Sequence, residues 1–219
     1  TGEALHDVAN ARLAACALTA QKAEAACASL ASEIVPVACE LSEPASVRRA
    51  VEQVKERAGE LDVLMCNAGI MALPQLELVC GHERQFFTNH IGHFMLVTGL
   101  LHRLSEAGRV VVLSSAEHKW APSGGIAFDA LTLADSYSPN SSYGQSKLAN
   151  LLFARALAKR LPKPKQSANA LHPGVIATNL SRHMNPVINA VMPIVSAIAM
   201  KSIPQGAATQ CYVAVHPEM

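Results

Sequence analysis

The feature that most constrains the fold of this chain is a repeated alternation of short apolar segments with longer helical ones. The apolar segments have the length of strands and lie at residues 12–18, 34–39, 61–66, 109–113 and 168–171. Helical patterns lie between or after them, at residues 21–32, 44–57, 81–105, 143–161, 187–200 and 205–215. The strand-like segments are apolar along their length, as strands buried on both faces are. The alternation predicts βαβ units and a doubly wound parallel sheet in a three-layer α/β/α arrangement.

Local signals predict the ends of one helix and the number of domains. Ser42 stands where an N-cap would accept a backbone hydrogen bond, and Pro44 fits the first helical turn. Gly59 follows the helix and predicts its end. No internal repeat, linker or low-complexity segment divides the sequence. Residues 1–219 are therefore predicted to form a single α/β domain.

Composition argues against several classes of protein. The net charge is +1, there is no basic run and aromatic residues make up 4%, so no nucleic-acid partner is predicted. The six cysteines form no Cys-x-x-Cys pair and have no matching histidine spacing, so we expect a reduced, cytoplasmic protein without disulfides or a metal site. No cationic leader precedes an apolar stretch, and no apolar run is long enough to span a bilayer.

Small and polar residues follow three of the predicted strands. They are Asn67-Ala68-Gly69, Ser114-Ser115, and the segment from His172 to Thr178. Each one alone is an ordinary turn, because glycine and proline occur in most loops. Ligands of open α/β sheets bind beyond the carboxyl ends of the strands, however. Their common position at strand ends therefore predicts a binding site at one edge of the sheet.

Tyr143 and Lys147 are four residues apart in a predicted helix that lies between two of these strands. Positions i and i+4 share one face of a helix, so the phenol and the ammonium can point into the same site. A tyrosine has a pKa near 10, and a neighbouring positive charge lowers it towards the range useful for acid–base catalysis. The spacing alone is common by chance, and its alternative interpretation is a surface tyrosine beside a solvated lysine.

Taken together, these motifs resemble the short-chain dehydrogenase/reductase family. The features are Asn67-Ala-Gly, Asn89 in a helix, Ser115 at a strand end, Tyr143-x-x-x-Lys147 and Pro173-Gly-x-x-x-Thr178, in that order. The segments around Asn67, Asn89 and His172 are most similar to its retinol-dehydrogenase-like and protochlorophyllide-reductase-like branch. The resemblance implies an NAD(P)-binding Rossmann domain. It also implies hydride transfer between a nicotinamide cofactor and an alcohol/carbonyl pair.

The resemblance implies a role for each catalytic residue. Tyr143 would exchange the proton with the substrate oxygen, and Lys147 would lower the pKa of the tyrosine and bind the nicotinamide ribose. Ser115 would hold the substrate oxygen and stabilise its developing charge. Asn89 would anchor a water chain from Lys147 to solvent, although it can also be an ordinary polar helix residue. The remaining cofactor-binding positions implied are Gly2, Glu40, Asn67, Ala68, Gly69, Pro173, Gly174, Ile176 and Thr178.

Two departures from the family pattern bear on the cofactor. Thr1-Gly2 is followed directly by helix-like residues, without the spaced glycines of a phosphate-binding loop and without a preceding strand. We therefore expect residues of the full protein to be missing before Thr1, between Gly2 and Glu3 and after Met219. Ala17 stands where a basic residue is expected, and no acidic residue replaces it, so the choice between NADP(H) and NAD(H) stays open. Glu40 replaces the usual aspartate near the adenine.

Other features have a structural interpretation beside a functional one. His90 and His93 are one helical turn apart, and packing is favoured over metal binding because no third ligand is in sight. The apolar segment 187–200 is interpreted as a lid over a hydrophobic substrate, with docking on a membrane surface as the alternative. Trp120 either lines the same pocket or anchors a loop. The helices at 81–105 and 143–161 correspond to a dimer interface in relatives.

The sequence thus predicts an NAD(P)-dependent alcohol dehydrogenase or carbonyl reductase for an apolar, retinoid-, steroid- or polyketide-like molecule. A second hypothesis is a catalytically silent relative that binds a partner or a small molecule. Intact Ser115, Tyr143 and Lys147 favour the enzyme, whereas the missing glycine loop and Ala17 favour the silent relative.

Overall fold

The computed structural model describes residues 12–28, 33–132, 137–176 and 201–219, and places strands and helices in alternation along them. The strands are β1 (Arg12–Ala17), β2 (Glu33–Ala38), β3 (Leu61–Cys66), β4 (Leu78–Val79), β5 (His82–Glu83), β6 (Leu104–Leu113) and β7 (Ser167–Leu171). The α-helices are α2 (Ala20–Cys27), α3 (Pro44–Arg57), α4 (Arg84–Phe86), α5 (Gly92–Leu100), α6 (Pro139–Ala158) and α8 (Ile203–Val215).

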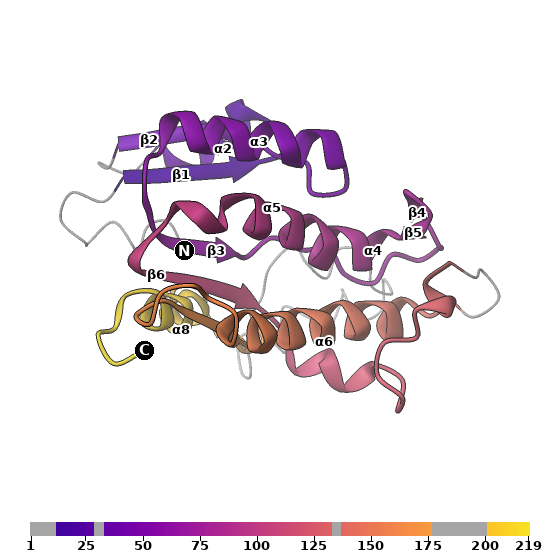
Figure 1. The fold of residues 1–219 in the computed structure, drawn as a ribbon. Coiled ribbons are helices and arrows are strands. Elements are labelled where there is room, and N and C mark those ends of the chain that lie inside the picture. The colour runs from indigo at the N-terminus through magenta and orange to yellow at the C-terminus, as the bar shows by residue number, and fades with distance from the viewer. Residues whose placement is uncertain (1–11, 29–32, 133–136, 177–200) are drawn as a thin grey trace.

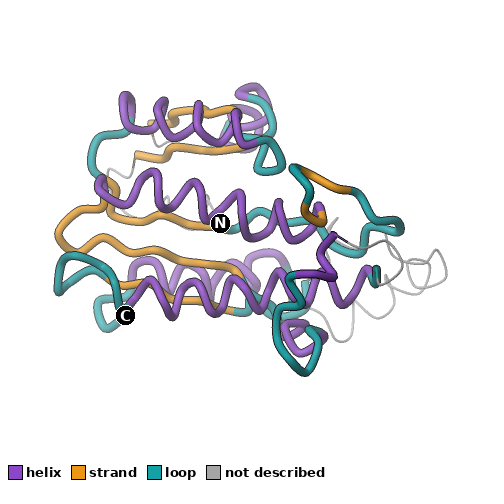
Figure 2. The backbone as a smooth tube through the Cα atoms, turned by 45° about the vertical axis from the view of Figure 1, so that its right-hand side comes forward, coloured by secondary structure: helices purple, strands orange, loops and turns teal. Residues whose placement is uncertain are grey.

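The long strands pair in parallel, as the alternation predicts. β1 pairs with β2, and β3, β6 and β7 form a three-stranded sheet in that order. Among the described residues, no strand pairs with both β1 and β3, so these two sheets are separate. The antiparallel hairpin of β4 and β5 stands apart from both of them (Figures 1 and 2).

Helices cover both faces of the three-stranded sheet. Val110 and Val112 point to one face, where their cluster includes apolar residues of α3, α5 and α6. Val111 and Leu113 point to the other face and pack against Val213 of α8. Side chains alternate between the two faces of a strand, so a strand with helices on both sides needs the unbroken apolar run seen here. Figures 1 and 2 show α6 and α8 on opposite sides of the sheet.

Helix α3 has the predicted span, residues 44–57, but a different N-cap from the predicted one. Helix α3 begins at Pro44 with Glu43 as N-cap and no side-chain capping bond, so the prediction that Ser42 is the N-cap was wrong. Ser42 instead donates its hydroxyl to Glu40 Oε1 at 2.7 Å and forms a turn before the helix. Gly59 lies just beyond the helix at φ +74°, a left-handed conformation that glycine adopts without strain.

The predicted helix at 81–105 is a composite of several elements. The hairpin strand β5 comes first, followed by α4, a π-helical turn at Phe87–Ile91, α5, and a 3₁₀ turn at Leu101–Arg103. Strand β6 then begins at Leu104, five residues earlier than predicted. A π-turn holds one extra residue compared with an α-turn, and such turns occur frequently at functional sites. Asn89 lies in the middle of this one.

Candidate active site

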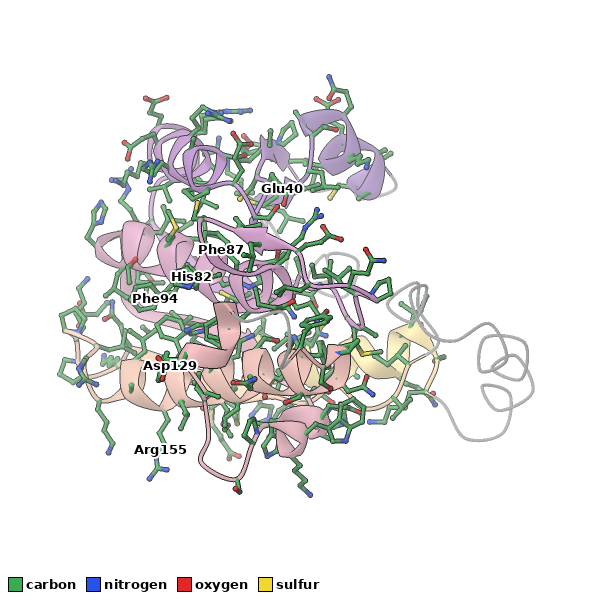
Figure 3. All side chains as sticks on the ribbon, turned by 90° about the vertical axis from the view of Figure 1, so that its right-hand side faces the viewer. Glu40, His82, Phe87, Phe94, Asp129 and Arg155 are labelled. Atoms are coloured by element: carbon green, nitrogen blue, oxygen red, sulfur yellow. The ribbon has the colours of Figure 1, made fainter. Side chains whose placement is uncertain are left out.

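Parallel pairing brings the ends of three strands to one edge of the sheet. The register aligns Cys66 with Val112 and Leu113 with Leu171, so the carboxyl ends of β3, β6 and β7 lie side by side. Just past β6, Ser114 donates its backbone N–H to the Leu171 carbonyl at 2.8 Å. The structure therefore brings the polar turns that follow these strands together. Figure 3 looks onto this edge.

Helix α6 presents a buried polar stripe to that edge. Ser138 is the N-cap of this helix, and its hydroxyl accepts a hydrogen bond from Ser141 N. Pro139 occupies the first turn. Its buried polar residues at helical spacing are Tyr143, Ser146, Lys147 and Asn150, each at most 5% exposed. Buried polar groups need partners, and each of these residues has one. The sequence analysis recognised two of the four, although Ser146 and Asn150 continue the same i, i+3, i+4, i+7 pattern.

The side chains of Tyr143, Lys147 and Ser115 lie together, the first two as predicted from their spacing. Lys147 Nζ lies 5.5 Å from the centroid of the Tyr143 ring and donates to the Leu113 carbonyl at 3.2 Å. Ser115 is buried, and its hydroxyl lies close enough to the Tyr143 phenol to lower the pKa of that phenol. Three groups capable of proton exchange and oxyanion stabilisation therefore meet at the end of β6.

Burial controls the protonation of this pair. Desolvation lowers the pKa of Lys147 to about 8. The nearby Glu117 carboxylate has the opposite, smaller effect on this pKa. Desolvation also raises the pKa of Tyr143 to about 12, although the Ser115 hydrogen bond lowers it. The predicted lowering of the tyrosine pKa by Lys147 is therefore not seen in this arrangement. The ammonium lies over the ring face and the phenol oxygen is buried, so desolvation outweighs the effect of the charge.

Asn89 joins the turn after β3 to helix α6 through its side chain. Its side chain accepts from Ile70 N at 2.8 Å and donates to Ile70 O at 2.9 Å and to Ser146 Oγ at 3.0 Å. A Cβ atom added to Gly69 would lie 3.1 Å from Asn89 Oδ1 and 3.6 Å from Lys147 Nζ. The Asn67–Gly69 turn thus passes close to Lys147 because residue 69 has no side chain.

The Asn89 carbonyl is the meeting point of two further side chains. Asn150 Nδ2 donates to it at 3.0 Å, and His93 Nδ1 lies 2.9 Å from it. A carbonyl only accepts, so His93 Nδ1 carries a proton, and burial lowers the pKa of this histidine to about 4. Asn150 Nδ2 also donates to Leu113 O at 3.0 Å. The π-turn, α6 and the end of β6 are therefore joined by one polar network.

His90 and His93, for which packing was favoured over metal binding, both make hydrogen bonds within the protein. His90 Nδ1 lies 3.1 Å from Asn150 Oδ1, and its ring also meets the rings of Phe86 and Phe153. Within the described part of the chain, no group of three or more His, Cys, Asp or Glu side chains is arranged to hold a metal ion. The six cysteines are all free thiols.

The cofactor-side predictions fall partly within the described residues. Asn67 and Ala68 are exposed at the carboxyl end of β3, and Gly174 adopts φ +93° in the turn after β7. That turn is held in place because Lys201 N donates to Val175 O at 2.9 Å and Ile176 bridges to Lys201. Pro173 lies in the same turn. Gly2 and Thr178 lie outside the described residues, as does the predicted lid at 187–200.

Ala17 and Glu40 lie at the ends of β1 and β2. The Ala17 carbonyl accepts from Cys39 N at 2.7 Å, so residue 17 stands directly at the strand end. Glu40 Oε1 accepts from both the backbone N–H and the hydroxyl of Ser42. Figure 3 shows Glu40 between the β1–β2 part of the molecule and the segment that carries Phe87. One oxygen of this carboxylate is therefore committed to the local turn.

The sequence analysis assigned no role to two residues that lie beside Ser115 and Lys147. Ser114 Oγ donates to the Lys147 carbonyl at 2.8 Å and fixes α6 to the end of β6. Glu117 lies on a 3₁₀ helix at Ala116–Trp120 and accepts a hydrogen bond from Ser115 Oγ. This 3₁₀ helix touches α6 at Gly144, where an added Cβ would lie 2.7 Å from Glu117 O. Both side-chain contacts depend on residue type, and the available signal for each residue is its place next to or near Ser115 in the sequence.

Two cavities flank this region. One of about 290 Å³ opens beside Ser115 and is lined by Ser114, Ser115, Ala116, His118, Lys119, Leu151, Ala170, Leu171 and His172. The other, of about 530 Å³, is an apolar groove over α5 and α6 that includes His82, Phe94, Phe128 and Leu152. His82 and Phe94 lie on the same side in Figure 3, and Arg155 extends from α6 away from them. Trp120, which is 46% exposed, lines neither cavity.

Comparisons with known proteins agree with this fold and with the arrangement of these residues. A family model described as enoyl-(acyl carrier protein) reductase matches residues 4–210. Short-chain dehydrogenase TIC 32 A, chloroplastic, of Brassica napus is 43% identical over 189 residues, which cover 82% of this chain and 59% of that protein. Human retinol dehydrogenase 14 is 39% identical over 191 residues, or 85% of this chain and 56% of that protein.

Solved structures agree with these sequence matches. A Mycobacterium paratuberculosis protein has a TM-score of 0.73 and 32% identity, covering 98% of this chain and 72% of that one. A short-chain dehydrogenase from Burkholderia cenocepacia in complex with NADP has a TM-score of 0.67 and 22% identity, covering 89% and 74%. The chain belongs to the short-chain dehydrogenase/reductase family. It spans less than two thirds of the length of the two relatives named above.

Proposed function

We propose that this protein transfers a hydride between NAD(P)(H) and the carbonyl or alcohol group of an apolar small molecule. The observation that carries the proposal is the convergence of Ser115, Tyr143 and Lys147 at the carboxyl edge of the sheet. Ligands of doubly wound folds bind at that edge. Family membership supports the same reaction class.

In the proposed mechanism, Tyr143 is the general acid for carbonyl reduction and the general base for alcohol oxidation. Its phenol is held against the Ser115 hydroxyl, so one substrate oxygen can meet both groups. Ser115 would donate to that oxygen as negative charge develops on it. Lys147 would relay the proton towards Asn89, whose side chain and carbonyl both face α6.

The residues present suit a nicotinamide nucleotide. Asn67 and Ala68 are exposed in the turn after β3, at the edge of the sheet where a ligand can meet the backbone. Asn67 and Lys147 would hold the ribose, and Pro173 to Ile176 with Thr178 the carboxamide end. When bound, the cofactor supplies or accepts the hydride, and the protein supplies position and proton. Glu40 and Gly2 would face the adenosine and phosphate end.

The proposed substrate is an apolar molecule, such as a retinoid-, steroid- or polyketide-like alcohol or ketone. Relatives named retinol dehydrogenase 14 and polyprenol dehydrogenase support that class. The apolar groove over α5 and α6, with Phe94 44% exposed, supports a homodimer through these helices. No described helix is long and apolar enough to cross a bilayer. We also propose that the enzyme is cytoplasmic, because its six cysteines are free thiols.

A panel of apolar alcohols and ketones tests the activity with NADH and NADPH, read by absorbance of the reduced nicotinamide. We expect turnover with at least one alcohol/ketone pair. A thermal-shift measurement with each cofactor separates the catalytically silent alternative. Failure of both cofactors to stabilise the full-length protein, together with no turnover, would refute the proposal.

A further inference from the structure

A carboxylate lies against the catalytic serine, and the proposed mechanism does not use it. Ser115 Oγ donates its proton to Glu117 Oε2. Glu117 is only half-buried, whereas Ser115 and Tyr143 are at most 7% exposed. The position of Glu117 is fixed from behind, because the backbone of the 3₁₀ helix packs directly on Gly144 of α6. This carboxylate is therefore part of the same polar site.

The hydrogen bond between Ser115 and Glu117 has a defined direction. A serine hydroxyl has a single proton and two lone pairs. The proton of Ser115 is donated to Glu117, so it is not available to another acceptor at the same time. In this state Ser115 presents lone pairs, and no proton, to the reacting groups. Donation to a substrate oxygen requires its O–H to leave Glu117.

This direction matters because alcohols and carbonyls make opposite demands on Ser115. A carbonyl oxygen only accepts, so a ketone needs the Ser115 proton and must take it from a charged acceptor. An alcohol has its own proton and can donate to the exposed lone pair without breaking that bond. Hydrogen bonds to ionised acceptors are about twice as strong as neutral ones, so the difference is sizeable.

We propose that Glu117 is a positioning residue that holds the Ser115 hydroxyl as a hydrogen-bond acceptor towards substrate and so favours binding of the alcohol over the ketone. This inference rests on the proposed function and concerns how the same site distinguishes the two partners of its reaction. Glu117 acts through Ser115 and need not touch substrate.

The charge of Glu117 supports this assignment independently of the hydrogen bond. The carboxylate raises the pKa of both Tyr143 and Lys147, so its field reaches both groups. A carbonyl oxygen can only accept and carries partial negative charge, so a nearby carboxylate disfavours it more than a hydroxyl, which can donate. Because oxidation and reduction share one transition state, this preference concerns which partner binds and not which direction is catalysed.

Steady-state kinetics with 2-octanol and 2-octanone test the proposal in the wild type and three variants. In Glu117→Ala, we expect the KM for 2-octanone to fall about tenfold, because Ser115 is freed to donate, while the KM for 2-octanol changes less than about twofold. Glu117→Gln keeps an acceptor oxygen and should restore most of the wild-type ratio of KM values. Glu56→Ala removes an exposed carboxylate from α3 and should leave the ratio unchanged.

A purely structural role for Glu117 would move both KM values together in Glu117→Ala, and that result, or an unchanged ratio, overturns the inference. Absence of wild-type turnover of any alcohol or ketone would instead refute the proposed function. The single tryptophan, Trp120, lies on the same 3₁₀ helix and then provides a fluorescence titration with the same two probes. Tighter 2-octanone binding in Glu117→Ala, relative to 2-octanol, supports the role of Glu117, and equal ratios in both proteins refute it.

Discussion

The sheet of β3, β6 and β7 differs sharply from the pair β1 and β2 in how firmly it holds its functional groups. Val110, Val111 and Val112 of β6 are fully buried, whereas no residue of β1 is. At the end of β6, Leu113 O receives both Lys147 and Asn150. Ala17 and Glu40 lie at the ends of β1 and β2, and the Glu40 carboxylate accepts hydrogen bonds from Ser42 in the same turn.

The difference separates the two halves of the proposed reaction. The reacting end of the site is specified by buried side chains with several partners each, so their positions follow from the packing of α6 on the sheet. At the end proposed for the adenosine, the described residues Ala17 and Glu40 are half-buried, and the Glu40 carboxylate bonds within its own turn. The chain therefore defines the chemistry much more tightly than the choice between NAD(H) and NADP(H).

Removing the phenol oxygen should have the largest effect. We expect Tyr143→Phe to lower kcat about 10³-fold, because the general acid–base is lost while the ring remains in the core. Thermal shifts with cofactor should stay close to those of the wild type, since the turns after β3 and β7 are unchanged. Retention of more than a tenth of the activity would contradict the assignment.

Adding one methyl group where α6 meets the 3₁₀ helix at Ala116–Trp120 should destabilise the folded protein. In Gly144→Ala the new Cβ would meet Glu117 O at 2.7 Å and Trp120 C at 2.9 Å, both backbone atoms. We expect the free energy of unfolding to fall by about 2–3 kcal/mol. Gly124→Ala is the matched control, because nothing lies within 4 Å of its added Cβ. Equal stability of the two variants in urea unfolding would show that this contact is not tight.

Replacing the buried lysine should stabilise the fold. Burial holds the Lys147 pKa at about 8, below the ordinary 10.5, so the unfolded chain binds more protons between these pH values. Wild-type stability should therefore rise with pH through this window. Lys147→Met should be more stable by roughly 1–3 kcal/mol below pH 8 and lose that advantage by pH 10.5. Asn150 still satisfies Leu113 O. A pH-independent difference between the two proteins in urea unfolding would rule out a buried charge.

A positive charge placed at the end of β1 should increase the preference for NADPH over NADH. If Ala17 faces the 2′-phosphate, Ala17→Arg should improve the ratio of NADPH to NADH affinity about tenfold, through a charge-assisted hydrogen bond. Ala26→Arg adds the same charge to an exposed position of α2 and should change the ratio little. A similar change in both variants would indicate a general field rather than a contact.

The strands were predictable from sequence because burial on both faces leaves an unbroken apolar signal. The predicted strand at 61–66 matches β3, and the one at 34–39 lies within a residue of β2. The pair Tyr143 and Lys147 and the turn at Asn67 were also found at one edge, as predicted. These features depend on local spacing and on parallel pairing, which the sequence carries.

What the sequence analysis did not find depends on contacts between distant segments. The π-turn around Asn89 is invisible as a pattern, because its partners Ile70 and Ser146 lie 19 and 57 residues away. The Ser42 N-cap was misplaced by one residue because its hydroxyl bonds to Glu40 rather than to the helix. Desolvation of Tyr143 likewise cannot be read from its spacing to Lys147.

The π-turn at Phe87–Ile91 makes the site sensitive to chain length as well as to side-chain identity. An α-helix of the same span would contain one residue fewer, and each residue turns a helix by about 100°. Loss of any one residue from this turn would therefore rotate Asn89 away from Ser146 without altering a single functional side chain. Insertions and deletions here should be far less tolerated than substitutions, although the segment is neither a loop nor part of the sheet.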